Sequence, residues 1–190
     1  MCAKVLAIAN QKGGVGKTTT SISLSSALAR MGKKVLVLDL DPHACATLHA
    51  RIYPEGITCS LHDLFLAQED AWPVIWPDLI HVQALPGIDV APGSIRLSEL
   101  EVDFRERQAK GSVLLRSLTH VRDEYDYIIL DCPPHVGILL VNALVAADLL
   151  IIPIQTDFLA LHGLKLLFDT LHTLNKALGR PVRYRAVPTM

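Results

Sequence analysis

A glycine-rich run near the beginning of the chain has the composition of a loop that holds phosphate groups. It comprises Lys12, Gly13, Gly14, Val15, Gly16, Lys17, Thr18 and Thr19. Small residues let backbone N–H groups curl around phosphate oxygens, and the N-terminus of a helix adds its partial positive charge. Lys17 would reach the β and γ phosphates of a nucleotide, and the Thr18 hydroxyl would bind Mg²⁺. We therefore predict a site for ATP or ADP with Mg²⁺.

The loop departs from the strict pattern G-x-x-x-x-G-K-[ST], because Gln11 stands at the first position and a second lysine, Lys12, follows it. One lysine suffices for the loop's own phosphates. Lys12 can therefore reach the nucleotide of a second subunit, as an arginine finger does. The competing interpretation is a glycine-rich turn without a ligand. The complete set of loop residues directly after an apolar run favours nucleotide binding.

Three aspartates follow apolar runs of strand length. Asp39 and Asp41 lie two residues apart, so alternation puts both carboxylates on one side of the chain. Carboxylates there can orient the attacking water or hold the hydration shell of a metal ion. Asp131 has the position of a Walker B aspartate, which holds Mg²⁺ through water. The alternatives are a solvated Asp-x-Asp-Pro turn and a helix cap at Asp131.

Elements that would position these residues alternate along the chain. Strands are predicted at residues 4–9, 34–40, 80–85, 127–130, 149–153 and 182–187. Helices are predicted at residues 18–31, 95–108, 112–122, 138–147 and 159–178. The alternation indicates an α/β fold, a doubly wound and mostly parallel sheet flanked by helices. Ligands of such sheets bind at the carboxyl ends of the strands, where the loop and the aspartates lie.

The composition excludes disorder and an overall basic field. Of 190 residues, 51% are hydrophobic, 19% are charged and only 5% are aromatic, with a net charge of −1. Aliphatic residues in this proportion are typical of a parallel sheet buried on both faces. The apolar stretch at residues 136–154 contains Asn142, Asp148 and Pro153, and indicates a buried helix and strand rather than a membrane span. The length fits one domain, residues 1–190.

Several segments together resemble the ParA/Soj-type partition ATPases, within the wider class that includes MinD. They are residues 10–20, 35–42, 125–134, 142–148, 152–155 and 160–164. The resemblance spans nearly the whole chain and is weakest at residues 51–122. It implies a P-loop ATPase whose two copies enclose ATP as a homodimer, with residues 154–163 lining the dimer face. It also implies a ParB-like activating partner, nonspecific DNA as a ligand, and a cytoplasmic, nucleoid-associated location.

The resemblance also implies roles for individual residues. The aspartate that matches Asp41 supports hydrolysis, and the one that matches Asp39 lies close to the magnesium shell. We therefore expect Lys12, Lys17 and Asp41 to be catalytic. The expected metal-binding residues are Thr18, Asp39 and Asp131, and the expected cofactor-binding residues are those of the phosphate loop.

Departures from the family pattern occur in both switch segments. The first usually reads Asp-Pro-Gln-Gly-Asn, whereas this chain has Asp-Pro-His-Ala-Cys at residues 41–45. His135 stands where the second switch commonly has a small or polar residue. We interpret His43 and His135 as ordinary loop histidines, because no spacing supports a metal pair. The four scattered cysteines predict free thiols, and Cys132 has no second cysteine suited to an iron–sulfur cluster.

Two alternatives to a DNA-binding partition protein stay open. A MinD-like protein would cycle on the membrane through a C-terminal amphipathic helix, and a metabolic P-loop kinase would have no use for Lys12. Lys176, Arg180, Arg183 and Arg185 form a basic cluster that suits phosphate contacts or a plain solvated surface. Because the chain ends directly after a predicted strand, we expect a C-terminal part to be missing, with the main DNA-binding residues in it.

Overall fold

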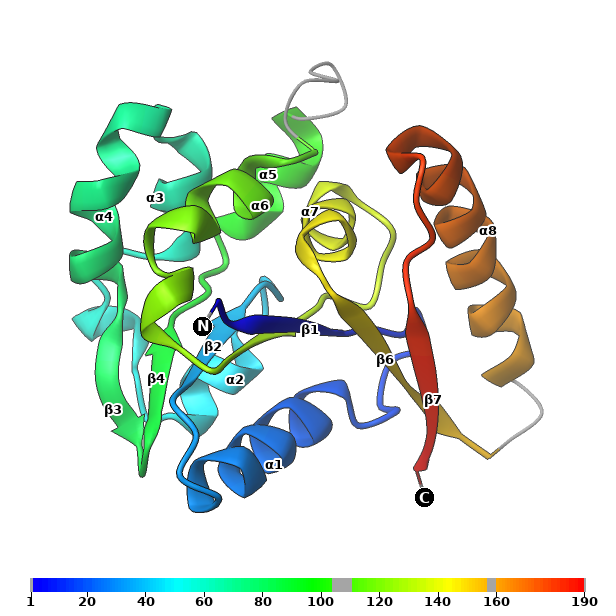
Figure 1. The fold of residues 1–190 in the computed structure, drawn as a ribbon, viewed down its shortest axis with the longest axis horizontal. Coiled ribbons are helices and arrows are strands. Elements are labelled where there is room, and N and C mark those ends of the chain that lie inside the picture. Colours follow the sequence, from blue (N-terminus) through cyan, green and yellow to red (C-terminus); the bar gives the residue numbers. More distant parts are fainter. Residues whose placement is uncertain (1, 104–110, 157–159, 190) are drawn as a thin grey trace.

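The computed structural model describes residues 2–103, 111–156 and 160–189. In this part of the chain, seven strands form one sheet in the order β3-β4-β2-β5-β1-β6-β7 (Figure 1). The strands are β1 Lys4–Ile8, β2 Val35–Asp39, β3 His81–Leu85, β4 Ile88–Ala91, β5 Tyr127–Asp131, β6 Leu149–Gln155 and β7 Tyr184–Thr189. Neighbouring strands are parallel except β3 and β4. The predicted α/β fold with a mostly parallel sheet is confirmed.

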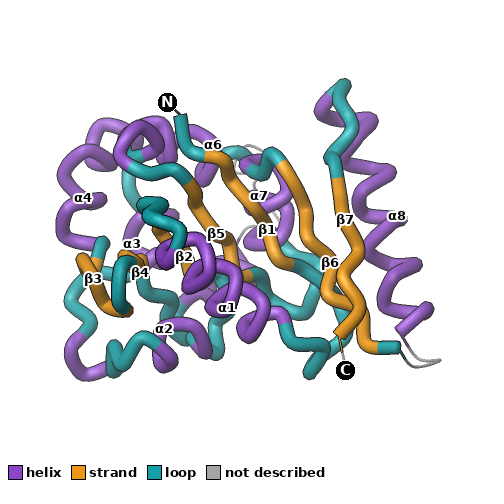
Figure 2. The backbone as a smooth tube through the Cα atoms, turned by 60° about the horizontal axis from the view of Figure 1, so that its bottom comes forward, coloured by secondary structure: helices purple, strands orange, loops and turns teal. Residues whose placement is uncertain are grey.

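Helices cover both faces of this sheet. They are α1 Lys17–Arg30, α2 Cys45–His49, α3 Leu61–Leu66, α4 Trp72–Leu79, α5 Leu97–Asp103, α6 Val113–Ser117, α7 Ile138–Ala146 and α8 Ala160–Leu178. Helices α1 and α2 lie on one face, and α3 to α8 pack on the other. Figure 2 shows α1 crossing in front of the central strands. The central strands are therefore buried from both sides.

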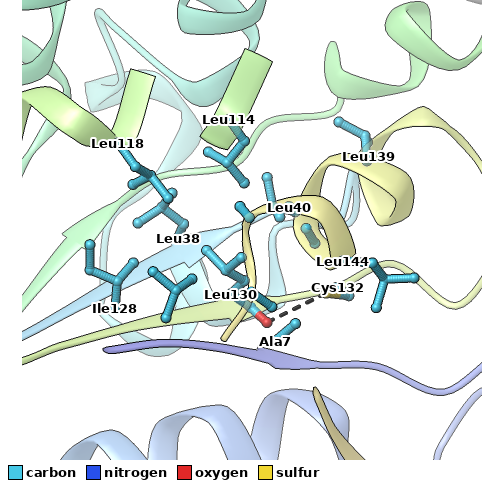
Figure 3. Close-up of a cluster of buried hydrophobic side chains, with 14 of the residues drawn as sticks. Ala7, Leu38, Leu40, Leu114, Leu118, Ile128, Leu130, Cys132, Leu139 and Leu144 are labelled. Atoms are coloured by element: carbon cyan, nitrogen blue, oxygen red, sulfur yellow. Dashed lines mark hydrogen bonds between the residues drawn. The ribbon is translucent and has the colours of Figure 1, made fainter. Parts of the chain in front are cut away.

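Two apolar clusters follow from the alternation of side chains along the strands. The larger cluster holds Leu36, Leu38 and Leu40 of the β2 segment and packs under α3 to α8. Figure 3 shows Leu38 and Leu130 from the sheet facing leucines of α6 and α7. Val35 and Val37 point the other way, into the cluster beneath α1. Alternate residues of one apolar strand therefore contribute to two hydrophobic clusters, one on each face of the sheet.

The region between residues 51 and 92 has more structure than its sequence pattern indicates. Helix α4 contains Pro73 in its first turn and Pro77 further on, which hide its helical pattern. Its Trp76 side chain is buried, and the indole Nε1–H donates to the Ser117 carbonyl at 2.9 Å. Strand β4 follows β3 after a turn at Gly87. We did not predict this strand from the sequence.

Two of the predicted helices match the described helices only in part. The predicted helix at residues 95–108 begins at Leu97, and its residues 104–108 lie outside the described part of the chain. The segment predicted as a helix at residues 112–122 breaks after Ser117 into the 3₁₀ turns Leu118–His120 and Arg122–Glu124. Among the described helices, none is long and apolar enough to span a bilayer.

Candidate nucleotide site

The carboxyl ends of three neighbouring strands bring the predicted site residues to one edge of the sheet. The phosphate loop follows β1, Asp39 ends β2 and Asp131 ends β5. Strand β5 lies between the other two, and Asp39 and Asp131 are direct partners in the β2–β5 register. The location agrees with the general rule that ligands of open α/β sheets bind at this edge.

Loop geometry suits the binding of an anion. Gly14 and Gly16 have φ angles of 75° and 84°, a region that side chains with a Cβ rarely adopt. Gly16 caps the N-terminus of α1 without a side-chain hydrogen bond. The N–H groups of the first turn of α1 therefore lack a side-chain cap and point toward the loop, the arrangement that binds phosphate in proteins.

Both loop lysines contact groups of their own chain. Lys17 is 8% exposed, and its Nζ donates to the Lys12 carbonyl at 3.4 Å. Burial lowers the pKa of Lys17, because it disfavours the charged ammonium. A phosphate anion beside Lys17 would have the opposite effect and favour the charged form. Lys12 Nζ donates to Gln155 Oε1 of β6 at 3.4 Å, and the Lys12 N–H donates to Asn10 Oδ1 at 3.1 Å. Asn10 Nδ2 in turn donates to the Pro153 carbonyl at 2.7 Å.

Asp131 accepts two hydroxyl hydrogen bonds from α1. Thr18 Oγ1 donates to Oδ2 at 2.7 Å, and Ser21 Oγ donates to Oδ1 at 2.8 Å. The carboxyl is fully buried, and this burial raises its pKa. A helix-capping role does not describe these contacts, because they join β5 to the side chains of a preceding helix. The predicted metal-binding pair Thr18 and Asp131 is thus already in contact.

Asp39 is held by Thr47 of α2. The Thr47 N–H and Oγ1–H both donate to Asp39 Oδ2, at 2.7 and 2.8 Å. Thr47 Oγ1 also accepts a hydrogen bond from the Gly93 N–H at 3.0 Å. Gly93 lies so close to the end of β2 that a Cβ there would be 2.4 Å from the Asp39 carbonyl oxygen. Burial, and next the charge of Asp131, raise the pKa of Asp39 to about 7.

Asp41 lies in a tight turn directly after β2. The Ala44 N–H donates to the Asp41 carbonyl at 2.8 Å, and the Asp41 N–H donates to Asp39 Oδ1 at 3.2 Å. Its carboxylate accepts hydrogen bonds from His43. Asp41 is 9% exposed, so it is more accessible than Asp39, which is completely buried. A solvated turn is therefore a poor description of this segment.

These groups fit a magnesium ion that is shared with a nucleotide. Mg²⁺ prefers oxygen ligands and commonly combines one or two carboxylates with phosphate oxygens and water. Thr18 and Asp131 would supply such oxygens, with Asp39 beside them. In the described part of the chain, no three His, Cys, Asp or Glu side chains gather into a metal cage. The fit therefore depends on phosphate oxygens to complete the coordination.

The segment after Asp131 is held by α5. Glu101 accepts hydrogen bonds from the Ile138 and Leu139 N–H groups at 2.9 and 3.3 Å. His135 Nε2 lies 3.6 Å from the same carboxylate. Cys132 is a buried free thiol whose Sγ–H donates to the Leu130 carbonyl at 3.5 Å (Figure 3). We interpreted His135 as an ordinary loop histidine, and this contact of a side chain that is 49% exposed is compatible with that interpretation.

Sequence reasoning missed several residues that position the site. Ser21 lies three residues after Thr18, a helical spacing that puts both hydroxyls on one face and could have revealed it. Thr47 and Gly93 have no comparable signal, because they reach Asp39 through tertiary packing. The expected dimer face at residues 154–163 includes residues 157–159, which lie outside the described part of the chain.

Comparisons with known proteins agree with this arrangement. The family model described as an AAA domain matches residues 3–183. The chain is 39% identical to the sporulation initiation inhibitor protein Soj of Bacillus subtilis, over 97% of this chain and 71% of Soj. It is 37% identical to the chromosome partitioning protein ParA of Caulobacter vibrioides, over 97% of this chain and 68% of that protein.

A solved structure of cobyrinic acid a,c-diamide synthase from Mycobacterium smegmatis, with bound ADP and magnesium, superimposes with a TM-score of 0.87. It is 34% identical to this chain, and the match covers 98% of this chain and 74% of the other. The matches to Soj, to ParA and to the AAA-domain model extend over nearly the whole sequence. This chain therefore belongs to the ParA/Soj family of partition ATPases.

Proposed function

We propose that this chain is an ATP-dependent dimerising switch that binds DNA without sequence preference and positions a chromosome, a plasmid or another large cargo. ATP and Mg²⁺ would join two copies face to face. A ParB-like partner would stimulate a weak ATPase activity and so separate them. The protein would act in the cytoplasm, in association with the nucleoid.

The observation that carries this proposal is the convergence of a phosphate loop, a Thr18–Asp131 contact and the Asp41 carboxylate on one edge of the sheet. The first two would hold the nucleotide and Mg²⁺. Asp41 would orient the water that attacks the γ phosphate. Bound Mg²⁺ would neutralise charge that develops on the phosphate oxygens. Lys17 would exchange the Lys12 carbonyl for the β and γ phosphates.

Lys12 supports the dimerising part of the proposal. Its Nζ contact with Gln155 Oε1 is long, at 3.4 Å, and the side chain is only partly buried. A phosphate oxygen carries negative charge whereas the Gln155 amide oxygen is neutral, so Lys12 Nζ would bond more strongly to a phosphate. A phosphate of the second subunit would thus offer Lys12 a favourable contact that exists only when two copies assemble with ATP bound.

Basic residues at the opposite end of the sheet support the DNA-binding part. Lys4, Arg180, Arg183 and Arg185 line a cavity of about 900 Å³. This cavity lies where β6 and β7 begin, away from the phosphate loop. Arg180 donates to the distant Val145 carbonyl at 2.9 Å, in a partly buried contact, whereas Arg185 donates to the carbonyl of its neighbour Tyr184 at 3.1 Å, in an exposed one. Arg183 and Arg185 are therefore the better candidates for phosphate contacts. Contacts of this kind are independent of sequence and weaken steeply with salt.

The experiment that tests the nucleotide site compares Lys17→Ala with Lys33→Ala, which alters an exposed lysine beyond the far end of α1. Calorimetry with ATP and Mg²⁺ should show a severe loss of affinity in Lys17→Ala and none in Lys33→Ala. Light scattering should show a wild-type dimer with ATP that Lys17→Ala fails to form. Wild-type affinity in Lys17→Ala would contradict the assignment of the phosphate loop.

A second experiment uses the full-length protein and separates the two partner surfaces. A gel shift on unrelated DNA duplexes should show binding that requires ATP and falls as salt rises. Replacement of Arg183 and Arg185 together by Ala should weaken it. Binding to anionic lipid vesicles without binding to DNA would instead favour the MinD-like alternative.

A further inference from the structure

The geometry points to His43 as a positioning residue that holds the Asp41 carboxylate for ATP hydrolysis, an inference that rests on the proposed function. The family pattern has glutamine at this position, so the histidine belongs to this chain rather than to the common motif. Its contribution is a second hydrogen bond to an oxygen that the backbone already holds.

Two donors of His43 meet the same carboxylate oxygen. The backbone N–H donates to Asp41 Oδ1 at 2.9 Å, and the ring atom Nδ1 lies 2.9 Å from that oxygen. Among the residues that the structure describes, no hydrogen bond reaches Asp41 Oδ2. Oδ1 is therefore engaged by His43, and Oδ2 is left as the oxygen that can accept a hydrogen bond from the attacking water.

The ring contact is the part that depends on the side chain. Any residue except proline at position 43 can donate its N–H to Asp41, because the Asp-Pro turn presents that group. The hydrogen bond from the imidazole ring requires a ring N–H within hydrogen-bond distance of the Asp41 carboxylate. Because a carboxylate accepts hydrogen bonds, it favours the tautomer of the ring with hydrogen on Nδ1. His43 is 74% exposed whereas Asp41 is 12% exposed at the side chain. Most of the His43 ring thus faces solvent, and its Nδ1 atom faces the Asp41 carboxylate.

Lys17 also attracts the Asp41 carboxylate electrostatically. Once phosphates engage Lys17, this attraction no longer orients the carboxylate by itself. The two His43 donors then keep Oδ1 in place, so that the orientation of Oδ2 survives nucleotide binding. Misplacement of a reacting group by about 1 Å can lower a rate on the order of a hundredfold. Loss of one of two anchors should therefore lower turnover and leave binding intact.

The test compares His43→Ala with His43→Asn, because an asparagine Nδ2 can replace the ring Nδ1 as a donor. Steady-state ATP hydrolysis should show kcat lowered roughly tenfold in His43→Ala, with KM for ATP nearly unchanged. His43→Asn should recover most of the loss. His49→Ala is the matched control, since the His49 ring contacts the Cys45 carbonyl of its own helix. A wild-type kcat in His43→Ala, or an Asn variant no better than Ala, would overturn the inference.

A second measurement is independent of activity. Nitrogen-15 NMR of the nucleotide-free protein should show His43 with hydrogen on Nδ1 when the ring is neutral, and this preference should disappear in Asp41→Ala. A neutral ring with hydrogen on Nε2 in the wild type would refute the contact. If Asp41→Ala hydrolyses ATP normally, the proposed function fails and this inference with it. If Asp41→Ala is inactive while His43→Ala is fully active, only the role of His43 is refuted.

Discussion

Replacement of Asp39 by asparagine should change how the stability of the nucleotide-free protein depends on pH. The pKa of Asp39 is about 7 in the folded chain against an ordinary value of 3.8. Between these values the folded protein keeps a proton that the unfolded chain has released. Unfolding therefore releases a proton, and the free energy of unfolding falls as the pH rises through this window. An asparagine side chain cannot titrate, so the variant lacks this contribution.

The magnitude follows from the two pKa values. From about pH 5 to about pH 8, wild type should lose roughly 2 to 3 kcal/mol of stability more than Asp39→Asn. The variant also alters hydrogen bonds to Thr47 and to the Asp41 N–H, but this offset is the same at both pH values and cancels. Urea denaturation without nucleotide or Mg²⁺ measures the difference. Asp169→Asn, on the exposed side of α8, should retain the wild-type pH dependence. Parallel pH dependences for wild type and Asp39→Asn would refute the reasoning.

Three further predictions concern Lys12, Asp41 and Gly93. Lys12→Ala should bind ATP by calorimetry yet lose a factor of about 10³–10⁵ in turnover and fail to dimerise; normal turnover would leave no role in the second subunit. Asp41→Ala should accumulate as an ATP-bound dimer in light scattering and retain DNA in a gel shift, and a monomer with ATP bound would instead assign Asp41 to assembly. Gly93→Ala should destabilise the protein by about 2 kcal/mol in urea denaturation, because its Cβ meets the Asp39 carbonyl. Gly56→Ala is the control and should leave the stability unchanged, because a Cβ there meets nothing within 4 Å. Equal stabilities of Gly93→Ala and Gly56→Ala would contradict the close approach of Gly93 to Asp39.

The sequence was sufficient to predict the central strands and the edge of the sheet at which the phosphate loop meets Asp39 and Asp131. Uninterrupted apolar runs identify buried parallel strands, and the carboxyl ends of such strands share one edge. The glycines of the loop, followed by Lys17 and Thr18, add a specific local pattern. These signals are local, so a single sequence carries them without any knowledge of tertiary contacts.

Tertiary contacts account for what the sequence did not reveal. Thr47 looks like an ordinary helix residue and Gly93 like an ordinary loop residue. They become important because α2 and the loop after β4 pack on the end of β2. Helix α4 escaped prediction because proline disrupts the pattern, although Trp76 anchors it in the core. His43 looked like a surface histidine, and its exposure agrees with that view. Its ring is nonetheless directed to Asp41 by the turn geometry, which composition and spacing do not encode.

Paired positions of Asp39 and Asp131 on adjacent parallel strands limit how this chain can vary in length. Successive side chains of a strand face opposite sides, so a shift of one residue would turn one carboxylate to the other face of the sheet. A single insertion or deletion within β2 or β5 would therefore dismantle the site while leaving the apolar character of the strand intact. The turn at Gly87, in the peripheral β3–β4 hairpin, carries no such restriction. Tolerance to length changes should thus rise from the centre of the sheet toward that edge.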